Sequence, residues 1–373
     1  MLHLLSSLEQ EVCQPAPSTA VAAAETMRHD AVPRWNPGTP IDKVPAAGGQ
    51  EVNDMNAAPR SPWAVVGLAA LLLAASSTGA EAADAQDTAA ACPGPRPHAF
   101  WEGVERGGFA LPPGTSAAEL LDELQPCLAS PDPKLRDNLV YEATAAWMYR
   151  DKRLSDAEVR KLLATWVANL RLGLGEEGTD SVLRRSFSAL CLSIVAALDN
   201  ARPFLERSEF ASLLRAALDY LAGEKDVRGF EPGKGWIHSA AHTADLLKFL
   251  ARSRHLLPAE QPLVLDAIGA KLEAAGQVFT HGENERLARA VASLARRADL
   301  DGAAFDRWLS GFTARHKQLW EAPEIDPLRL AAEQNGKDLL RSLFVELVLD
   351  AGPERAGEGP RGRVLECLRN LAA

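Results

Sequence analysis

The feature that most constrains the fold is a succession of amphipathic helical patterns that runs from about residue 117 to the end of the chain. Serine or aspartate opens many of these patterns, and glycine or proline closes them, as is typical of helix starts and stops. No segment alternates convincingly between apolar and polar residues as a strand does. The patterns span residues 117–128, 134–149, 155–174, 180–198, 208–223, 236–253, 261–279, 284–298, 302–320, 328–349 and 362–372.

About ten consecutive helices joined by short loops indicate antiparallel helix pairs packed side by side. Alanine, leucine, arginine and glutamate dominate the chain and only 6% of residues are aromatic, which also favours helix over sheet. No repeat of fixed length is evident. We therefore expect an all-α fold, either a degenerate HEAT-like α-solenoid or a compact α/α helical array. It would form a single domain over residues 117–373, preceded by an irregular segment over residues 83–116.

The beginning of the chain has a different pattern. Prolines are scattered through residues 1–54 without periodicity, so this part lacks the apolar surface that would offset the entropy of ordering. From Met55, a short polar start leads into an apolar run over residues 63–75 and then into small residues ending at Ala82. This is the layout of a secretory signal peptide over 55–82, and the apolar run is shorter than the roughly 20 residues that span a bilayer. Residues 1–54 then form a disordered or mis-annotated extension before the true start.

The signal peptide predicts a periplasmic or secreted protein with no stable membrane span after cleavage. The alternative is a disordered cytoplasmic extension that precedes a marginal membrane anchor. In an oxidising compartment Cys92 and Cys127 can pair, because they flank the first mature helix. Equally, a cysteine can serve as a small buried hydrophobic residue, as expected of Cys191 within its apolar helix.

Charge excludes one class of partner. The chain carries 50 acidic against 40 Lys and Arg residues, a formal net charge of -10, and no dense basic tract. Because neutralising nucleic-acid phosphates requires concentrated positive charge, we expect no nucleic-acid partner.

The segment over residues 226–247 differs from its neighbours. A charged, glycine-rich loop runs directly into a helix that we expect to begin near Trp236. On a helical wheel of about 100° per residue, His238, His242 and Asp245 share one side, opposite a stripe rich in alanine. Their i, i+4, i+7 spacing lets the three side chains converge, and we expect them to lie on an open, reachable side.

Three interpretations of this cluster remain open. His238 and His242 can ligate a divalent metal, with Asp245 as a further ligand or as an orienting group, although the HExxH pattern is absent. Alternatively, one histidine is a general base oriented by Asp245, and Lys234 or Arg228 holds an anionic substrate. In the third interpretation, the polar groups form a structural network that ties the loop to the helix.

Neighbouring loops contain further candidates. Lys234 lies between two glycines just before a helix start, where an anion is favoured, although the pattern does not satisfy the phosphate-binding Walker motif. His281 and Glu283 lie in another loop before a helix, where acidic residues commonly stabilise the helix dipole. Asp180 is most simply the N-cap of its helix.

Four segments together resemble a bacterial family catalogued as domain of unknown function 2785, in order across roughly residues 120–330. They are LRDNLVYEATAAWM, GEEGTDSVLRRSFSALCLSIV, DVRGFEPGKGWIHSAAHTADLL and FTHGENERLARAVASL. The most specific element is GKGWxHxxAHxADLL, at residues 233–247. The resemblance implies one helical domain without an established activity or cofactor, and it points again to Lys234, Trp236 and the histidine cluster. Thr243 stands where the family tends to show glycine.

We therefore expect an exported helical-repeat protein of unknown activity that binds an unknown small ligand or peptide at residues 226–249. The alternative is a hydrolase that uses the cluster of His238, His242 and Asp245, with a divalent metal as a candidate cofactor. The residues that we expect to contact the ligand are Arg228, Lys234, Trp236, His281 and Glu283.

Overall fold

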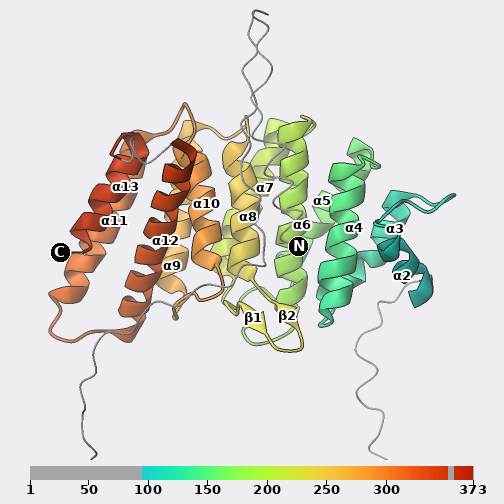
Figure 1. The fold of residues 1–373 in the computed structure, drawn as a ribbon, viewed down its shortest axis with the longest axis horizontal. Helices are drawn as coiled ribbons and strands as arrows, with labels where there is room; N and C mark the ends of the chain where they lie inside the picture. The colour runs from blue at the N-terminus through green and yellow to red at the C-terminus, as the bar shows by residue number, and fades with distance from the viewer. Residues whose placement is uncertain (1–94, 352–356, 373) are drawn as a thin grey trace, which may run out of the picture. The chain divides into compact units, whose positions relative to one another are not determined.

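The computed structural model describes residues 95–351 and 357–372, and these residues form an all-helical array with one very short hairpin (Figure 1). The predicted all-α fold class is confirmed. The predicted extension over 1–54, the signal peptide over 55–82 and Cys92 lie outside the described residues.

The helical elements follow one another with short connections. The first part of the array contains α2 (His98–Arg106), α3 (Ala117–Leu124), the 3-10 helix η1 (Gln125–Ala129), the π-helix η2 (Lys134–Tyr141), α4 (Glu142–Thr144), the π-helix η3 (Ala145–Arg150), α5 (Asp156–Asn169), α6 (Ser181–Ala201) and α7 (Arg207–Gly223). The second part contains α8 (Ser239–Arg252), the 3-10 helix η4 (Pro258–Glu260), α9 (Gln261–Ala274), α10 (Glu283–Ala295), α11 (Gly302–Trp320), α12 (Pro327–Ala351) and α13 (Gly359–Asn370).

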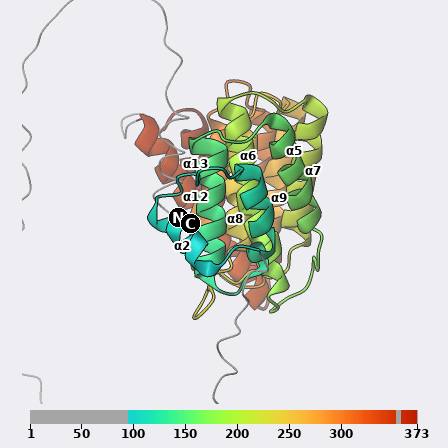
Figure 2. The ribbon, with the colours of Figure 1, turned by 90° about the vertical axis from the view of Figure 1, so that its right-hand side faces the viewer.

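The helices lie in two layers (Figures 1 and 2). In one layer α6, α8, α10 and α12 pack side by side in that order. In the other layer α5 packs on α6, α7 contacts α8 and α9, and α11 packs on α9. Two helices of the first layer, α6 and α8, thus pack against the helix that precedes them in the chain, as short connections favour.

The central element is α6, which is buried on almost every side. It contacts α5, α8 and η3 at once. Among the described helices, α6 is long and apolar enough to cross a membrane, yet 89% of its apolar stretch is buried within the protein. A helix that is hydrophobic all round belongs in a core of this kind. Cys191, on this helix, is a buried free thiol, as expected.

The start of α8 differs from the prediction. We expected the helix to begin near Trp236, but it begins at Ser239. The preceding residues form an antiparallel hairpin of β1 (Phe230–Glu231) and β2 (Gly235–Trp236), so the expectation of no strand was wrong at this point. Gly233 and Gly235 have positive φ angles of 84° and 74°, a backbone conformation that glycine adopts without steric penalty and that reverses the chain here.

Two other local predictions have clear outcomes. Ser155 caps α5, with Glu158 completing a reciprocal capping box, as its place before the helical pattern indicated. The segment over 83–116, expected to be irregular, contains α2. Cys127 is disulfide-bonded, whereas Cys191 and Cys367 are free.

Candidate functional site

The residues singled out in the sequence gather where the N-terminal ends of α6, α8 and α10 meet the hairpin (Figure 1). Because α8 lies between α6 and α10 and also contacts α7, every residue from His238 to Ala251 is buried. The expectation that the histidine side of this helix is open was therefore wrong. A wheel separates the two sides of a helix, but it does not show that a second neighbour covers the polar one.

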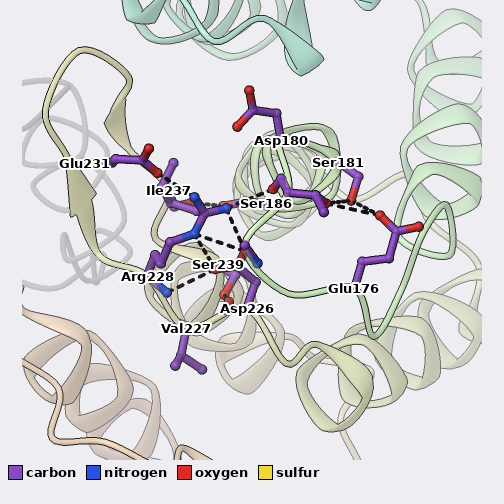
Figure 3. A network of polar contacts seen from close by, with 12 residues as sticks. Glu176, Asp180, Ser181, Ser186, Asp226, Val227, Arg228, Glu231, Ile237 and Ser239 are labelled. Atoms are coloured by element: carbon purple, nitrogen blue, oxygen red, sulfur yellow. Dashed lines mark hydrogen bonds and ion pairs between the residues drawn. The ribbon is translucent and has the colours of Figure 1, made fainter.

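The outer part of the site is an ion-pair network that holds the hairpin (Figure 3). Arg228 lies between two carboxylates, with Nη2 2.7 Å from Oδ2 of Asp226 and Nη1 2.5 Å from Oε2 of Glu231. Its Nη2 also donates to the carbonyl oxygen of Thr179. Burial raises the pKa of Asp226, but hydrogen bonds from Arg228 outweigh this and hold that pKa below its usual value. Arg228 thus ties the hairpin to the loop before α6.

Lys234 makes a similar connection from the tip of the hairpin. Its Nζ lies 2.7 Å from Oδ1 of Asp180 and 3.2 Å from Oε1 of Glu231. The hydrogen bond to Asp180 raises the pKa of Lys234. Asp180 occupies the N-cap position of α6, as predicted, but its side chain makes no capping hydrogen bond. The structure uses this carboxylate to anchor the hairpin.

Arg136, on the π-helix η2, binds the backbone of the hairpin. It was not among the predicted site residues. Its guanidinium is fully buried and Nη2 donates to the carbonyl oxygens of Lys234 and Trp236, at 2.7 and 3.2 Å. The guanidinium also lies 4.5 Å from the ring centre of Phe187. The available signal was the family resemblance, whose first segment includes this arginine.

His238 joins the hairpin to α8 in a strained conformation. Its φ of 50° is left-handed, which is uncommon outside glycine. Its ring stacks on Trp236, with centroids 4.3 Å apart, and Nε2 lies 2.8 Å from the carbonyl oxygen of His281. Burial, together with the charge of Arg286, lowers the pKa of His238 to about 3. The imidazole is therefore neutral at physiological pH.

His242 lies one turn further along α8 and is completely buried. Its Nδ1 lies 2.8 Å from Oγ of Ser186 on α6, and that hydroxyl donates to the carbonyl oxygen of Ile237 at 2.5 Å. Burial, with the charge of Arg286, holds the pKa of His242 well below its usual value. The rings of His238 and His242 are perpendicular, with centroids 5.7 Å apart.

These contacts determine which nitrogen of each neutral ring carries the proton. A carbonyl oxygen only accepts, so Nε2 of His238 is the protonated nitrogen. The one hydroxyl proton of Ser186 goes to Ile237, so Oγ accepts from a protonated Nδ1 of His242. Nδ1 of His238 and Nε2 of His242 therefore carry lone pairs. Both atoms are buried and have no hydrogen-bond partner among the residues that the structure describes. We call these two side chains the imidazole pair.

Asp245, the third member of the predicted cluster, points to α10. Its Oδ2 lies 2.7 Å from Nη1 of Arg286, and its Oδ1 lies 3.7 Å from Nζ of Lys248. The structure thus brings the two histidines together but pairs the aspartate with cations. Arg286 was missed because it lies 41 positions beyond Asp245 in a pattern that reads as an ordinary amphipathic helix.

The loop before α10 also reaches the imidazole pair. Oε2 of Glu283 accepts from the backbone N–H of His281 at 2.8 Å, and its Oε1 lies 3.8 Å from Nε2 of His238.

The hydroxyl of Tyr141, on η2, is buried and has no partner among the described residues. Burial raises the pKa of Tyr141 well above its usual value, and the nearby carboxylate of Asp245 adds to the rise.

The arrangement limits which ions the cluster can hold with protein ligands alone. Among residues 95–351 and 357–372, no group of three or more His, Cys, Asp or Glu side chains is placed to hold a metal ion. The imidazole pair supplies two neutral nitrogen donors. Any occupant must complete its remaining contacts with groups from outside this set.

Comparison with known proteins finds one matching family model, and that model carries no activity. Residues 170–345 match the model of the family described as "Protein of unknown function (DUF2785)". The match covers the hairpin, α6, α8 and α10, and therefore most of the site. Searches of curated proteins and of solved structures found no match.

Proposed function

We propose that this chain, which carries a domain of the DUF2785 family over residues 170–345, is an exported protein that binds a small ligand at the imidazole pair. The ligand would contact Nδ1 of His238 and Nε2 of His242. Arg228 and Lys234 would hold the hairpin over the site, because carboxylates of the protein already bind both cations. The segment over 226–249 is thus the binding segment, with its inner rather than its outer face as the site.

The observation that carries this proposal is that Nδ1 of His238 and Nε2 of His242 have no hydrogen-bond partner among the described residues. Most buried side-chain polar atoms of folded proteins have a partner, and leaving one unpaired costs about 1–3 kcal/mol. Here two such atoms belong to neighbouring rings that are 2% and 0% exposed. A bound ligand would provide the partner that the described residues do not supply.

Backbone strain at the same residue supports a binding role. His238 is held in the left-handed region at φ 50°, and a non-glycine residue there costs on the order of 1 kcal/mol. Such strain persists only where the surroundings impose it, and it clusters at ligand sites. The hairpin hydrogen bonds from Ile237 N and His238 N to the carbonyls of Gly229 and Arg228 impose it here.

The burial of the pair supports a small ligand over a peptide. A peptide needs an open groove, whereas both ring nitrogens lie below the surface. The side chain of Arg286, next to the pair, is 10% exposed. Its only side-chain hydrogen bond to the described residues is the one from Nη1 to Asp245. Its other nitrogens can therefore donate to an anionic or carbonyl oxygen of the ligand.

Export is the second part of the proposal. It rests on the signal-peptide pattern over 55–82, and the disulfide at Cys127 supports it because disulfides persist mainly in oxidising compartments. Mass spectrometry of the protein recovered from a producing cell tests this part. We expect a mature chain that begins after Ala82, and recovery of an intact Met1 would refute export.

Native mass spectrometry of the purified protein tests ligand binding. We expect a bound mass that is released on denaturation and is absent from His242→Phe, which removes one lone pair but keeps an aromatic ring. The matched control is His255→Gln, which changes a histidine outside the cluster that contacts the carbonyl oxygen of Leu205. If His242→Phe and wild type show the same bound mass, or if neither shows any, the pair is not a ligand site.

A further inference from the structure

We infer that the group held by the imidazole pair is a divalent transition-metal ion, ligated by Nδ1 of His238 and Nε2 of His242. This inference rests on the proposed function, because it assigns a chemical class to the ligand of the same site. It goes beyond that function by predicting an inorganic ion with a defined stoichiometry.

The first support is the separation of the two rings. A zinc ion lies about 2.0–2.1 Å from a ligating imidazole nitrogen, and therefore about 3.2 Å from the ring centroid. Two rings that share one ion then have centroids about 5.2 Å apart at a tetrahedral angle, and at most about 6.4 Å apart when the ion is midway between them. The observed separation of 5.7 Å lies inside this range.

The second support is the way in which each ring is held. Metal-ligating histidines usually donate their other ring N–H to a carbonyl, a carboxylate or water, which sets the tautomer and orients the ring. His238 donates Nε2–H to the carbonyl oxygen of His281, and His242 donates Nδ1–H to Oγ of Ser186. Both remaining nitrogens are thus free of protons and hydrogen bonds, as a ligand atom must be.

The donor set also selects the class of ion. Neutral imidazole nitrogen suits zinc, copper, nickel and related ions, whereas calcium and magnesium require oxygen ligands. With two described protein ligands, positions on the ion remain open for exogenous groups, as they do in catalytic rather than structural sites.

The charges around the pair determine what fills those positions. Asp245 is already matched by Arg286 and Lys248, so a bare divalent ion would add uncompensated charge to a buried place. The ion must therefore carry an anionic ligand. Arg286 is placed to donate to that anion, because its remaining guanidinium nitrogens make no hydrogen bond to the described residues. Metal and anion together form the proposed ligand.

Metal titration of the chelator-treated protein provides the test. Cobalt(II) is added to the apoprotein and the visible absorption of the bound ion is followed, and zinc(II) is then added to displace it. We expect one ion per chain and at least tenfold weaker binding in His242→Gln and in His238→Asn. Asparagine is chosen at position 238 because it tolerates the left-handed backbone. His255→Gln should bind as wild type does.

Absence of binding would overturn the inference, and so would binding that both site variants retain, since the ion would then be held elsewhere. If no metal binds but the bound mass disappears in His242→Phe, the ion is refuted and the proposed function stands. If both measurements fail, both proposals fail. Should a variant not fold, X-ray absorption of the zinc-loaded wild type decides, because two imidazole ligands are expected and none would refute the inference.

Discussion

The ion pair between Arg185 and Glu224 offers the sharpest test of how the loop before the hairpin is held. Nε of Arg185 lies 2.6 Å from Oε2 of Glu224, and the two side chains are 0% and 2% exposed. Nη2 contacts Oε1 at 3.1 Å, so the pair is bidentate. Lys271, also buried, donates to the carbonyl oxygen of Glu224. We consider the substitution Glu224→Gln.

This substitution keeps the shape of the side chain and removes its charge. Arg185 and Lys271 then remain buried as cations without the neighbouring carboxylate. Breaking a buried pair in this way costs about 3–5 kcal/mol, because a desolvated charge remains without its counter-ion. At about 2–4 °C per kcal/mol for a domain of this size, the melting temperature should fall by roughly 6–20 °C.

Thermal unfolding followed by circular dichroism measures the effect. The control is Asp219→Asn, which breaks an exposed pair with Arg215 whose side chains are 51% and 78% exposed. That control should change stability by less than about 0.5 kcal/mol. The double variant Arg185→Met with Glu224→Leu should recover much of the loss, since an apolar replacement removes both buried charges. If Glu224→Gln melts within 1–2 °C of the Asp219→Asn control, roughly the shift that 0.5 kcal/mol allows, the reasoning is refuted.

Three further predictions concern single residues. Gly229→Ala should lower stability by about 1–3 kcal/mol, because a Cβ there would lie 2.5 Å from the imidazole of His281; Gly103→Ala, where nothing lies within 4 Å, should be neutral or stabilising in the same melts. Burial raises the pKa of Asp137 from 3.8 to about 6, so the folded state binds the carboxyl proton of Asp137 more tightly than the unfolded state does. The free energy of unfolding, measured with urea, should therefore fall by about 3 kcal/mol as the pH rises from 3.8 through 6. Asp137→Asn should remove that slope, and an unchanged slope would contradict the assignment. Cys127→Ser should lower the melting temperature to that of the reduced wild type, and reductant should not change the melting temperature of this variant. A further drop in the melting temperature of the variant on reduction would contradict a single stabilising disulfide at Cys127.

Much of the array follows from local pattern. Helical periodicity together with start and stop residues located most of the helices, because an amphipathic segment buries its apolar stripe whatever its partner is. Ser155 caps its helix as expected, since a capping box involves residues only three positions apart. The i, i+4 spacing likewise brought His238 and His242 together, with centroids 5.7 Å apart.

The prediction failed where a backbone reversal or a distant side chain decides the outcome. The helix start near Trp236 was misplaced because Gly233 and Gly235 turn the chain into a hairpin. Asp245 follows its helical spacing, yet an arginine on α10 binds it. Arg136 comes from about 100 positions away in the sequence to hold the hairpin carbonyls.

By itself, the sequence determined the helical class, the approximate helix boundaries and the proximity of the two histidines. These depend on interactions within a few turns of one chain segment. Long-range packing sets the rest: α6 and α10 bury both sides of α8, Ser186 and His281 set the tautomers, and two ring nitrogens remain without a partner among the described residues. Burial and partner choice depend on residues that are distant in sequence and adjacent in space, so no local pattern contains them.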